Sequence, residues 1–444
     1  MLNVIKMRYP SKISKLYLLK LSIPIFFSNL ATPFVGIVDT GLMGHLNNVK
    51  FLAASSIATS VITMVFWSFG FLRMGTTGLI AQLLGKGDYR EIVLTTIRYL
   101  TLAFFIGFII LFLKIPIMMG IKYFFVTSEE TYLLINKYIS VRLFSAPAEL
   151  CIYVLAGLYI GLQKTKISSF MIAFFALLNI FLSVYFVKYL NLNIYGVALG
   201  TVVSSYITII IFLIFSYFYI HKTFNIIPRF KNVFLPKKFF KMFGINFDIF
   251  VRTFLLTFAF LWFTYQSSIV GEDFLAVNTI LIQFIIISSF FLDAYAFSTE
   301  GVVGFSLGRK IKKSFLHAVS NSFKLSIYTG LIISIIYFFS FKYLINYLTD
   351  IDYLRFLSYS FIVWVLIIPP IASICYQYDG IFIGTSQTKD MRNSMILSVL
   401  IFILLSIFLT KAFNNHGLWL SLLIFMIVRS LTLKFFFSNI LKKF

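Results

Sequence analysis

The sequence predicts an all-α integral membrane protein with twelve transmembrane helices in two six-helix lobes related by a parallel internal repeat. Three observations lead to this prediction. The chain is 60% hydrophobic and only 12% charged, whereas a soluble domain carries about 25% charged residues. Apolar runs of bilayer-spanning length recur twelve times. Residues of the first half also recur in the second half at a constant offset of 223.

A helix needs about 20 apolar residues to cross a bilayer. We expect the spans at about 17–44, 51–83, 92–120, 131–160, 168–189, 194–220, 247–270, 274–306, 315–345, 353–383, 392–411 and 416–438. Pro24 and Pro33 in the first span and Pro369 and Pro370 in the tenth each remove a backbone hydrogen bond, which predicts bends there.

The basic residues predict the orientation of the spans. They concentrate in the N-terminal segment, in the connector 221–246 and in alternate short loops, which carry Lys86, Arg90, Lys164, Lys166, Arg309, Lys310, Lys312, Lys313, Lys389, Arg392, Lys442 and Lys443. The positive-inside rule then places both termini in the cytoplasm. The net charge of +23 therefore indicates membrane topology and contact with lipid headgroups, and we expect no nucleic-acid partner.

The internal repeat divides the chain into a lobe 1–220, the basic cytoplasmic connector 221–246 and a lobe 247–444. Rare residue types match without a gap at the offset of 223: Gly107 with Gly330, Pro147 with Pro370, Gly157 with Gly380, Gly161 with Gly384, and Thr165-Lys166 with Thr388-Lys389. Parallel repeats of this kind are typical of transporters, which hold their substrate near the midplane between the halves and work by rocking. The repeat thus favours a transporter over an enzyme.

The most informative single residue is Asp39, because it ends an apolar run that carries no other charge from Leu21 onward. A carboxylate within a transmembrane helix costs about 2.5–3.5 kcal/mol and usually has a function. Asn29, Thr32 and Gly36 share its helix face at three- and four-residue spacing, so this stripe, with Met43, is a candidate lining of a substrate cavity. The alternative is a structural ion pair with an arginine. Asp39 corresponds to Trp262 in the repeat, which confines the predicted ion-coupling site to the first half.

Neutral polar residues on the fifth and sixth spans are candidate partners of this acid. Asn179 and Ser183 lie four residues apart and therefore on one helix face, and Thr201 lies early in the next span. They are able to tune a neighbouring carboxyl group by hydrogen bonding. For Ser183 and Thr201, ordinary interhelical hydrogen bonding is an equally good interpretation.

Four further acids lie inside apolar runs. Glu149 is a candidate for the lining of the substrate cavity, but it follows Arg142 by seven residues, which also predicts a structural ion pair across two helical turns. Asp293, Glu300 and Asp379 have no acid at the equivalent position of the first half, and each is a candidate for a cavity that attracts a cationic substrate. The four histidines and two cysteines have no metal or disulfide spacing. We therefore predict no metal and no cofactor beyond H⁺ or Na⁺ as the coupling ion.

The motifs resemble those of the multidrug and toxic compound extrusion (MATE) transporters. The stretch Val38-Asp39-Thr40-Gly41-Leu42-Met43-Gly44-His45-Leu46 is similar to the family's first-helix signature, and the fourth-span pattern Arg142-x-x-x-Ala146-Pro147 resembles the DNA-damage-inducible protein F (DinF) branch. The resemblance implies antiport of organic cations against protons or sodium ions. It groups Asp39 with Asn179 and Thr201, places Ser183 where the family has a second acid, and marks Pro24 as the hinge of a bend linked to drug release.

The resulting hypothesis is a secondary active multidrug antiporter. It exports lipophilic or cationic organic compounds in exchange for protons, or for Na⁺, by rocking of two lobes in the plasma (inner) membrane of a bacterium. We expect a monomer whose partners are small organic molecules and membrane lipids. One alternative is a flippase for a lipid-linked precursor, with cations drawn from Arg73, Arg98, Arg142, Arg252 and Arg355. Another is a membrane-embedded transferase, for which the sequence offers no nucleophile or metal cluster.

Overall fold

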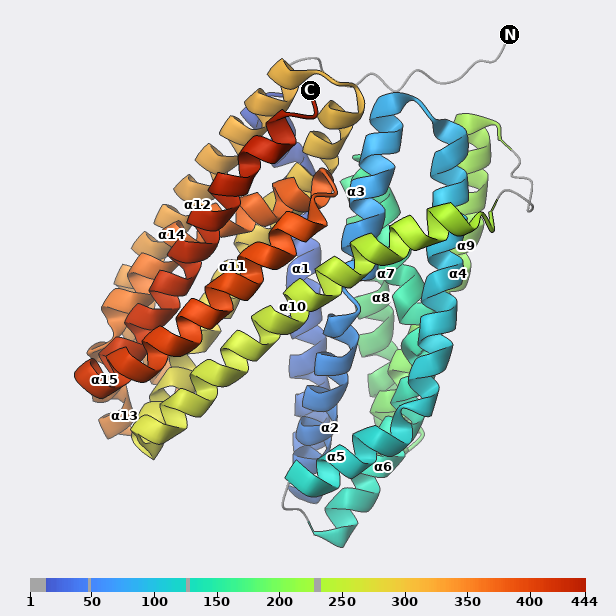
Figure 1. Cartoon of the computed structure of the whole chain (residues 1–444). Coiled ribbons are helices and arrows are strands. Elements are labelled where there is room, and N and C mark those ends of the chain that lie inside the picture. Colours follow the sequence, from blue (N-terminus) through green and yellow to red (C-terminus); the bar gives the residue numbers. More distant parts are fainter. Residues whose placement is uncertain (1–12, 47–48, 125–127, 227–232) are drawn as a thin grey trace. The chain divides into compact units, whose positions relative to one another are not determined.

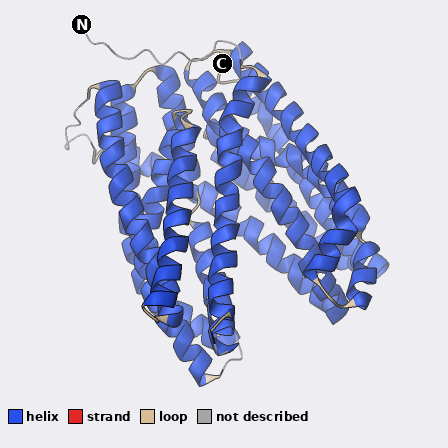
Figure 2. Ribbon diagram, turned by 180° about the vertical axis from the view of Figure 1, so that it is seen from behind, coloured by secondary structure: helices blue, strands red, loops and turns tan. Residues whose placement is uncertain are grey.

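The computed structural model of the chain describes residues 13–46, 49–124, 128–226 and 233–444, and this part is helical throughout apart from short turns (Figures 1 and 2). Its elements are α1 (Lys15–Gly44), α2 (Val49–Ser68), α3 (Phe71–Lys86), α4 (Tyr89–Phe112), α5 (Lys114–Phe124), α6 (Glu129–Arg142), the 3₁₀ turn Leu143–Ser145, α7 (Ala146–Gly161), α8 (Thr165–Val184), the π turn Tyr185–Tyr189, α9 (Asn193–Phe224), α10 (Pro236–Val270), α11 (Glu272–Gly308), α12 (Lys312–Leu348), α13 (Asp352–Tyr359), α14 (Ile362–Gly384) and α15 (Thr388–Leu441).

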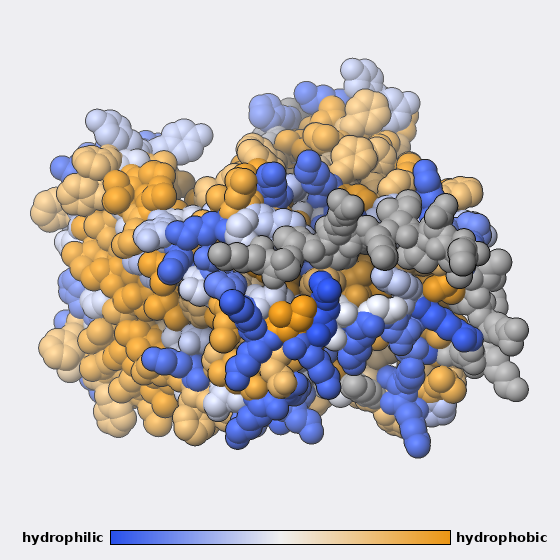
Figure 3. All heavy atoms as spheres, turned by 90° about the horizontal axis from the view of Figure 1, so that it is seen from above, coloured by the Kyte–Doolittle hydropathy of each residue, from blue (hydrophilic) through white to orange (hydrophobic). Residues whose placement is uncertain are grey.

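The helices confirm the predicted fold class. Eleven helical stretches in the described part are long and apolar enough to cross a membrane. The last of them, α15, has 54 residues and contains a non-helical backbone at Asn414 (φ 51°, ψ −136°), so it joins the two final predicted spans across a sharp kink. Figure 3 views one end of the helices, where many hydrophilic side chains gather. Along the spans, by contrast, large apolar side chains are exposed, among them Phe105, Phe181 and Phe339. A bilayer requires this distribution of polar ends and apolar sides.

The chain forms two compact units. Phe27–Met242 belong to the N-terminal unit, whereas Phe243–Phe444 and the segment Pro10–Phe26 belong to the C-terminal unit. Helices α1 and α10 therefore each have residues in both units. The predicted connector 221–246 is helical at both ends, because α9 continues to Phe224 and α10 begins at Pro236. Its residues 227–232 and the basic N-terminal residues 1–12 lie outside the described part.

The backbone of the two units repeats the sequence offset of 223. Three pairs of residues with positive φ recur at this spacing: Gly87 and Lys310, Gln163 and Ser386, and Asn191 and Asn414. L-residues rarely adopt this conformation, so its recurrence at equivalent turns is a strong signature of duplication. The two units thus share their turns as well as their helices.

Equivalent close helix contacts also recur in both units. A Cβ atom on Gly107 would lie 2.4 Å from Pro147 Cα, and one on Gly330 would lie 2.8 Å from Pro370 Cα. In the same way, a Cβ atom on Gly157 would lie 2.4 Å from the carbonyl oxygen of Arg73, so no side chain fits there. Small residues allow this close approach of membrane helices. The glycines and prolines matched in the sequence are therefore the contact points of each bundle.

In each unit, a side chain at the same position of the repeat donates a hydrogen bond to the backbone just before a long helix begins. Arg98 on α4 donates from Nε to the carbonyl oxygen of Val233, before α10, at 2.7 Å. Asn321 on α12, at the offset of 223, donates from Nδ2 to the carbonyl oxygen of Ile13, before α1, also at 2.7 Å. Glu91 reinforces the first of these anchors, because its carboxylate pairs with Arg98 at 2.6 Å and with Lys238 at 2.7 Å.

Candidate ion-coupling site

Asp39 lies near the C-terminal end of α1 and is the only acidic residue of that helix. Its side chain is half-buried. The Oδ1 atom is fully buried and accepts no hydrogen bond from the residues that the structure describes. Its polar neighbours include Ser183, Arg142 and Tyr138. A buried carboxylate oxygen without a donor is costly, so this atom is a natural place for a proton or a small cation.

Helices α8 and α9 supply the neutral side chains of the site. Asn179 Nδ2 donates to Thr201 Oγ1 at 3.0 Å, and Ser183 Oγ donates to Asn179 Oδ1 at 3.1 Å. All three residues are buried. The structure therefore brings together the four residues that the sequence analysis grouped. It also connects Asn179, Ser183 and Thr201 into a hydrogen-bonded chain that ends beside Asp39.

Glycine allows α8 and α9 to meet at this site. A Cβ atom on Gly200 would lie 2.7 Å from Ser183 Oγ and 2.8 Å from the backbone nitrogen of Ser183. Gly196, one turn earlier, faces Phe186 in the π turn that follows α8. Two glycines four residues apart thus form the small-residue stripe on which membrane helices pack closely. Without Gly200, Thr201 would lie farther from Asn179.

The arginine beside Asp39 already has a partner. Arg142, at the end of α6, donates from Nη1 to Glu149 Oε1 at 2.6 Å and from Nη2 to Glu149 Oε2 at 3.3 Å. The Phe66 ring lies 4.8 Å from the guanidinium carbon of Arg142. The predicted pair of Arg142 and Glu149 is therefore present, and Glu149 is a counter-charge of Arg142 in this structure. Counting Asp39, the three groups carry one surplus negative charge.

The remaining candidates of α1 differ in their surroundings. Asn29 and Pro24 are half-buried, and Met43 is buried. A Cβ atom on Gly36 would meet no atom within 4 Å. Thr32 lies in α1, but its side chain is outside the described part. The boundary between the two units falls after Phe26, two residues beyond Pro24, and the role of Pro24 as a hinge remains a prediction.

The C-terminal unit has a neutral counterpart of the acid site. Trp262, the equivalent of Asp39, donates from Nε1 to Ser406 Oγ at 2.8 Å, and Ser406 is the equivalent of Ser183. The two units therefore share the geometry of this contact but not its charge. An indole cannot carry a proton in exchange for cargo, so only the N-terminal unit has an ionisable group at this place.

The acids of the C-terminal unit require one correction. Asp379 was a candidate for attracting a cationic substrate, but Arg252 on α10 and Arg429 on α15 both donate to its Oδ2 atom. These two guanidinium groups neutralise Asp379, so it is no longer a candidate for attracting a cationic substrate. Asp293 lies close to the same groups and adds a second negative charge to the cluster. Asp293 is half-buried and near Tyr376, and Glu300 is fully buried. Both belong to the C-terminal unit, whereas Asp39 belongs to the other.

One polar network was not anticipated from the sequence. Asn278 on α11 donates to Ser267 Oγ at 2.8 Å and to Asn415 Oδ1 at 2.7 Å, and its own Oδ1 accepts from Trp419 Nε1 at 2.8 Å. It lies in the apolar core of the C-terminal unit beside the kink at Asn414. The Asn414-Asn415 pair inside an apolar run was the available signal, since buried amides require partners.

A duplicated array of membrane-spanning helices, with an acid inside the first of them, defines a class of multi-pass membrane transporters. The sequence profile of the MatE family matches this chain twice, at residues 24–185 and 249–410. The chain belongs to the MATE family of transporters, which confirms the resemblance noted in the sequence and sets aside the alternative of a membrane-embedded transferase.

Similar proteins agree with this assignment. The chain is 30% identical over 413 residues to DNA damage-inducible protein F of Escherichia coli strain K12, covering 93% of this chain and 90% of that one. It superposes on an outward-facing multidrug resistance MATE family transporter of the MOP superfamily with a TM-score of 0.86 and 16% identity, covering 97% and 96%. A MOP superfamily transporter from Pyrococcus furiosus, with a binding pocket of reverse polarity, gives a TM-score of 0.85 at 17% identity, covering 97% and 96%.

Proposed function

We propose that this chain is a proton-coupled antiporter that exports lipophilic, often cationic organic compounds across the inner membrane of a bacterium, with both termini in the cytoplasm. One observation carries the proposal. Asp39 is an acid in a membrane-length helix, and one of its oxygens is buried without a hydrogen-bond donor in the described part of the chain. Such a group binds a proton on one side of the membrane and releases it on the other.

The surroundings of Asp39 favour a proton over a sodium ion. Sodium is a hard cation that needs several oxygen ligands and negative charge. At this site the amide oxygen of Asn179 already accepts from Ser183, and the hydroxyl oxygen of Thr201 already accepts from Asn179. Ser183 stands where the family has a second acid. The site therefore offers one carboxylate and few free oxygens, which suits a proton.

The mechanism couples this proton to cargo by mutual exclusion. When the cavity faces the cytoplasm, ionised Asp39 adds negative charge that favours a cationic compound. When it faces outward, protonation removes this charge and weakens binding of the compound. The coupling is reciprocal, so a bound compound must equally weaken binding of the proton. Aromatic side chains add stacking and cation–π contacts to flat cations.

The flippase alternative draws on arginines that form no cluster in the sequence. It requires a cluster of free cations for a pyrophosphate group, and it drew on five arginines. In the structure Arg98 pairs with Glu91, Arg142 with Glu149, and Arg252 with Asp379. Arg355 pairs with Asp350 and Asp352 at the start of α13. Each of these four arginines already has a carboxylate partner, and they do not share one site.

Dye efflux from proteoliposomes tests the proposal. The wild-type chain should export a cationic dye under an imposed pH gradient and not under a sodium gradient alone, and Asp39→Asn should abolish this export at a normal protein level. Asp352→Asn is the matched control, because Asp352 is an exposed acid outside the apolar spans. Efflux at the wild-type rate by Asp39→Asn would refute the proposed mechanism. Efflux driven by a sodium gradient alone would show that the coupling ion is Na⁺ and not the proton.

A further inference from the structure

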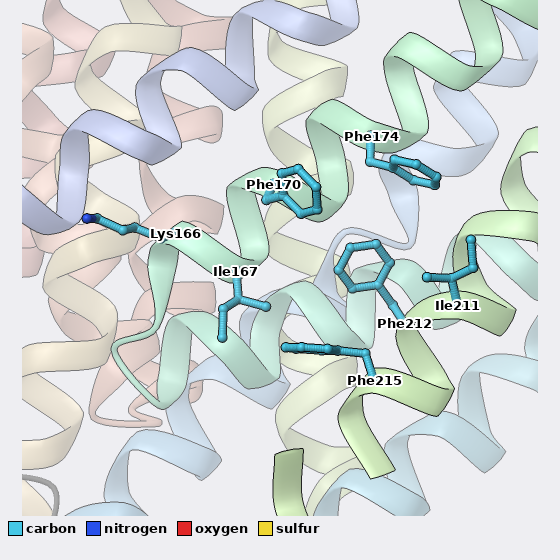
Figure 4. Close-up of a pocket in the computed structure, with 7 residues that line it drawn as sticks. All are labelled: Lys166, Ile167, Phe170, Phe174, Ile211, Phe212 and Phe215. Atoms are coloured by element: carbon cyan, nitrogen blue, oxygen red, sulfur yellow. The ribbon is translucent and has the colours of Figure 1, made fainter. Parts of the chain in front are cut away.

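An apolar groove lies on the flank of the N-terminal unit between α8 and α9. It has a volume of about 390 Å³ and is lined by Lys166, Ile167, Phe170, Phe174, Ile211, Phe212 and Phe215. Figure 4 shows that the four phenyl rings gather around the groove, while the Lys166 side chain extends away from them. Phe170 is 65% exposed and Phe215 is 42% exposed, so the groove opens to the surroundings of the helices.

The groove lies at one end of two membrane-spanning helices. Lys166 is the second residue of α8, and Phe174 follows eight residues later, a rise of about 12 Å. One leaflet contributes about 15 Å to the hydrocarbon core of a bilayer. The groove therefore spans most of the depth of a single leaflet, from the level of the headgroups inward.

The mouth of the groove is basic. Lys164 and Lys166 lie at the start of α8, and His221 and Lys222 lie in the last turn of α9. Tyr159 lies near the end of α7, shortly before α8 begins. Its hydroxyl group forms a hydrogen bond with Ser216 Oγ of α9 at 2.6 Å, which holds the end of α9 close to the start of α8. Positive charge at the entrance and an apolar interior are complementary to an anionic headgroup on a hydrocarbon chain. Basic pockets between membrane helices on the cytoplasmic side bind such lipids.

The internal repeat indicates that the fold does not require this groove. At the offset of 223, Lys166 corresponds to Lys389, but the apolar lining is largely replaced by polar residues: Ile167 by Asp390, Phe170 by Asn393, Ile211 by Lys434 and Phe215 by Ser438. Asp390 accepts a hydrogen bond from Asn439 at 3.2 Å there. The C-terminal unit thus keeps the cation but has polar residues at four of the six apolar positions of the lining.

We propose that this groove binds one acyl chain of an anionic phospholipid of the cytoplasmic leaflet, with the phosphate group held at Lys166. The choice of leaflet rests on the proposed topology, but lipid binding does not depend on the proposed transport activity. The bound lipid contacts α8 and α9, the two helices that carry Asn179, Ser183 and Thr201. Its occupancy therefore influences how these helices pack at the coupling site.

Native mass spectrometry of the purified full chain tests this proposal, with phosphatidylglycerol or phosphatidylcholine added in equal amounts. The wild type should retain one phosphatidylglycerol molecule and release phosphatidylcholine. Phe170→Asn and Ile211→Lys copy the residue types of the other unit and should lose the retained lipid. Lys166→Glu should weaken phosphatidylglycerol retention at least about fivefold, the contribution of one surface cation near an anionic lipid. Lys389→Glu, its counterpart in the repeat, should not.

The same spectra contain the outcomes that overturn the proposal. Equal losses of phosphatidylglycerol in Lys166→Glu and Lys389→Glu would show a general effect of charge and would rule out a specific site at Lys166. If the wild type retained phosphatidylcholine as well as phosphatidylglycerol, the proposed recognition of an anionic headgroup would be refuted. A wild-type dimer that Ile211→Lys converts to a monomer would make a second copy of this chain the occupant. A cooperative thermal unfolding transition in detergent establishes that each variant is folded. A variant that is not folded is replaced by Phe215→Ser, and retention of the lipid by Phe215→Ser would refute lipid binding in the groove.

Discussion

Glu149 holds the guanidinium group of Arg142 in an ion pair close to Asp39. Removal of Glu149 should therefore reduce transport, because Arg142 would then pair with Asp39. In the structure the two hydrogen bonds from Arg142 to Glu149 are 2.6 and 3.3 Å long, and the side chains are 13% and 8% exposed. Breaking a buried pair by removing one partner costs about 3–5 kcal/mol, because a charge remains buried without a counter-charge. Glu149→Gln leaves the guanidinium group in that state.

Asp39 is the acid available to receive this guanidinium group. Arg142 is already its charged neighbour, and Asp39 Oδ1 has no donor within the described residues. A hydrogen bond between charged groups recovers about 1.5–3 kcal/mol. Since 1.4 kcal/mol corresponds to a factor of ten, this new pair would hold Asp39 ionised against protonation by about ten- to a hundredfold. Proton-driven dye efflux by Glu149→Gln should fall by at least about tenfold.

The double variant distinguishes this reasoning from simple damage to the fold. Arg142→Met together with Glu149→Met removes both charges at similar volume, which is often neutral for stability, and leaves Asp39 without a clamp. Efflux from proteoliposomes should therefore recover in the double variant relative to Glu149→Gln, at equal protein per vesicle. Wild-type efflux by Glu149→Gln, or a double variant no better than the single one, would refute the account.

Three further predictions concern packing. Gly200→Ala should lower the unfolding temperature, at a cost of about 1–3 kcal/mol for overpacking, and should reduce efflux because its Cβ atom would meet Ser183. The control is Gly120→Ala in α5, whose Cβ atom would meet no atom within 4 Å. Equal effects of the two substitutions would contradict the prediction. Trp262→Phe should lose one hydrogen bond, about 1 kcal/mol, without loss of efflux. Asn278→Leu should destabilise the chain by about 3 kcal/mol or more, because it leaves buried donors without acceptors, and an unchanged melting temperature would show that the network contributes nothing.

The number of spans, the repeat and the place of the acid were all determined by the sequence alone. The bilayer imposes a length and an apolar composition on every span, and both are visible locally. The kink within α15 follows the same logic, since Asn414 interrupts an apolar run at the position equivalent to Asn191. Glycine and proline matches at a fixed offset also identify the contact points of each bundle, because small residues allow helix backbones to approach closely.

The pairing of charges was decided only by the tertiary structure. Arg142 and Glu149 lie two turns apart, so their contact follows from local spacing. Asp379, in contrast, meets Arg252 across 127 residues and Arg429 across 50, and no periodicity reveals such a contact. Which acids are neutralised depends on how each helix is rotated against its neighbours, and that rotation is set by the packing of whole faces. Asp39 is a candidate for carrying a proton because this packing places neutral side chains beside it, gives its neighbour Arg142 another partner, and leaves Oδ1 without a hydrogen-bond donor among the described residues.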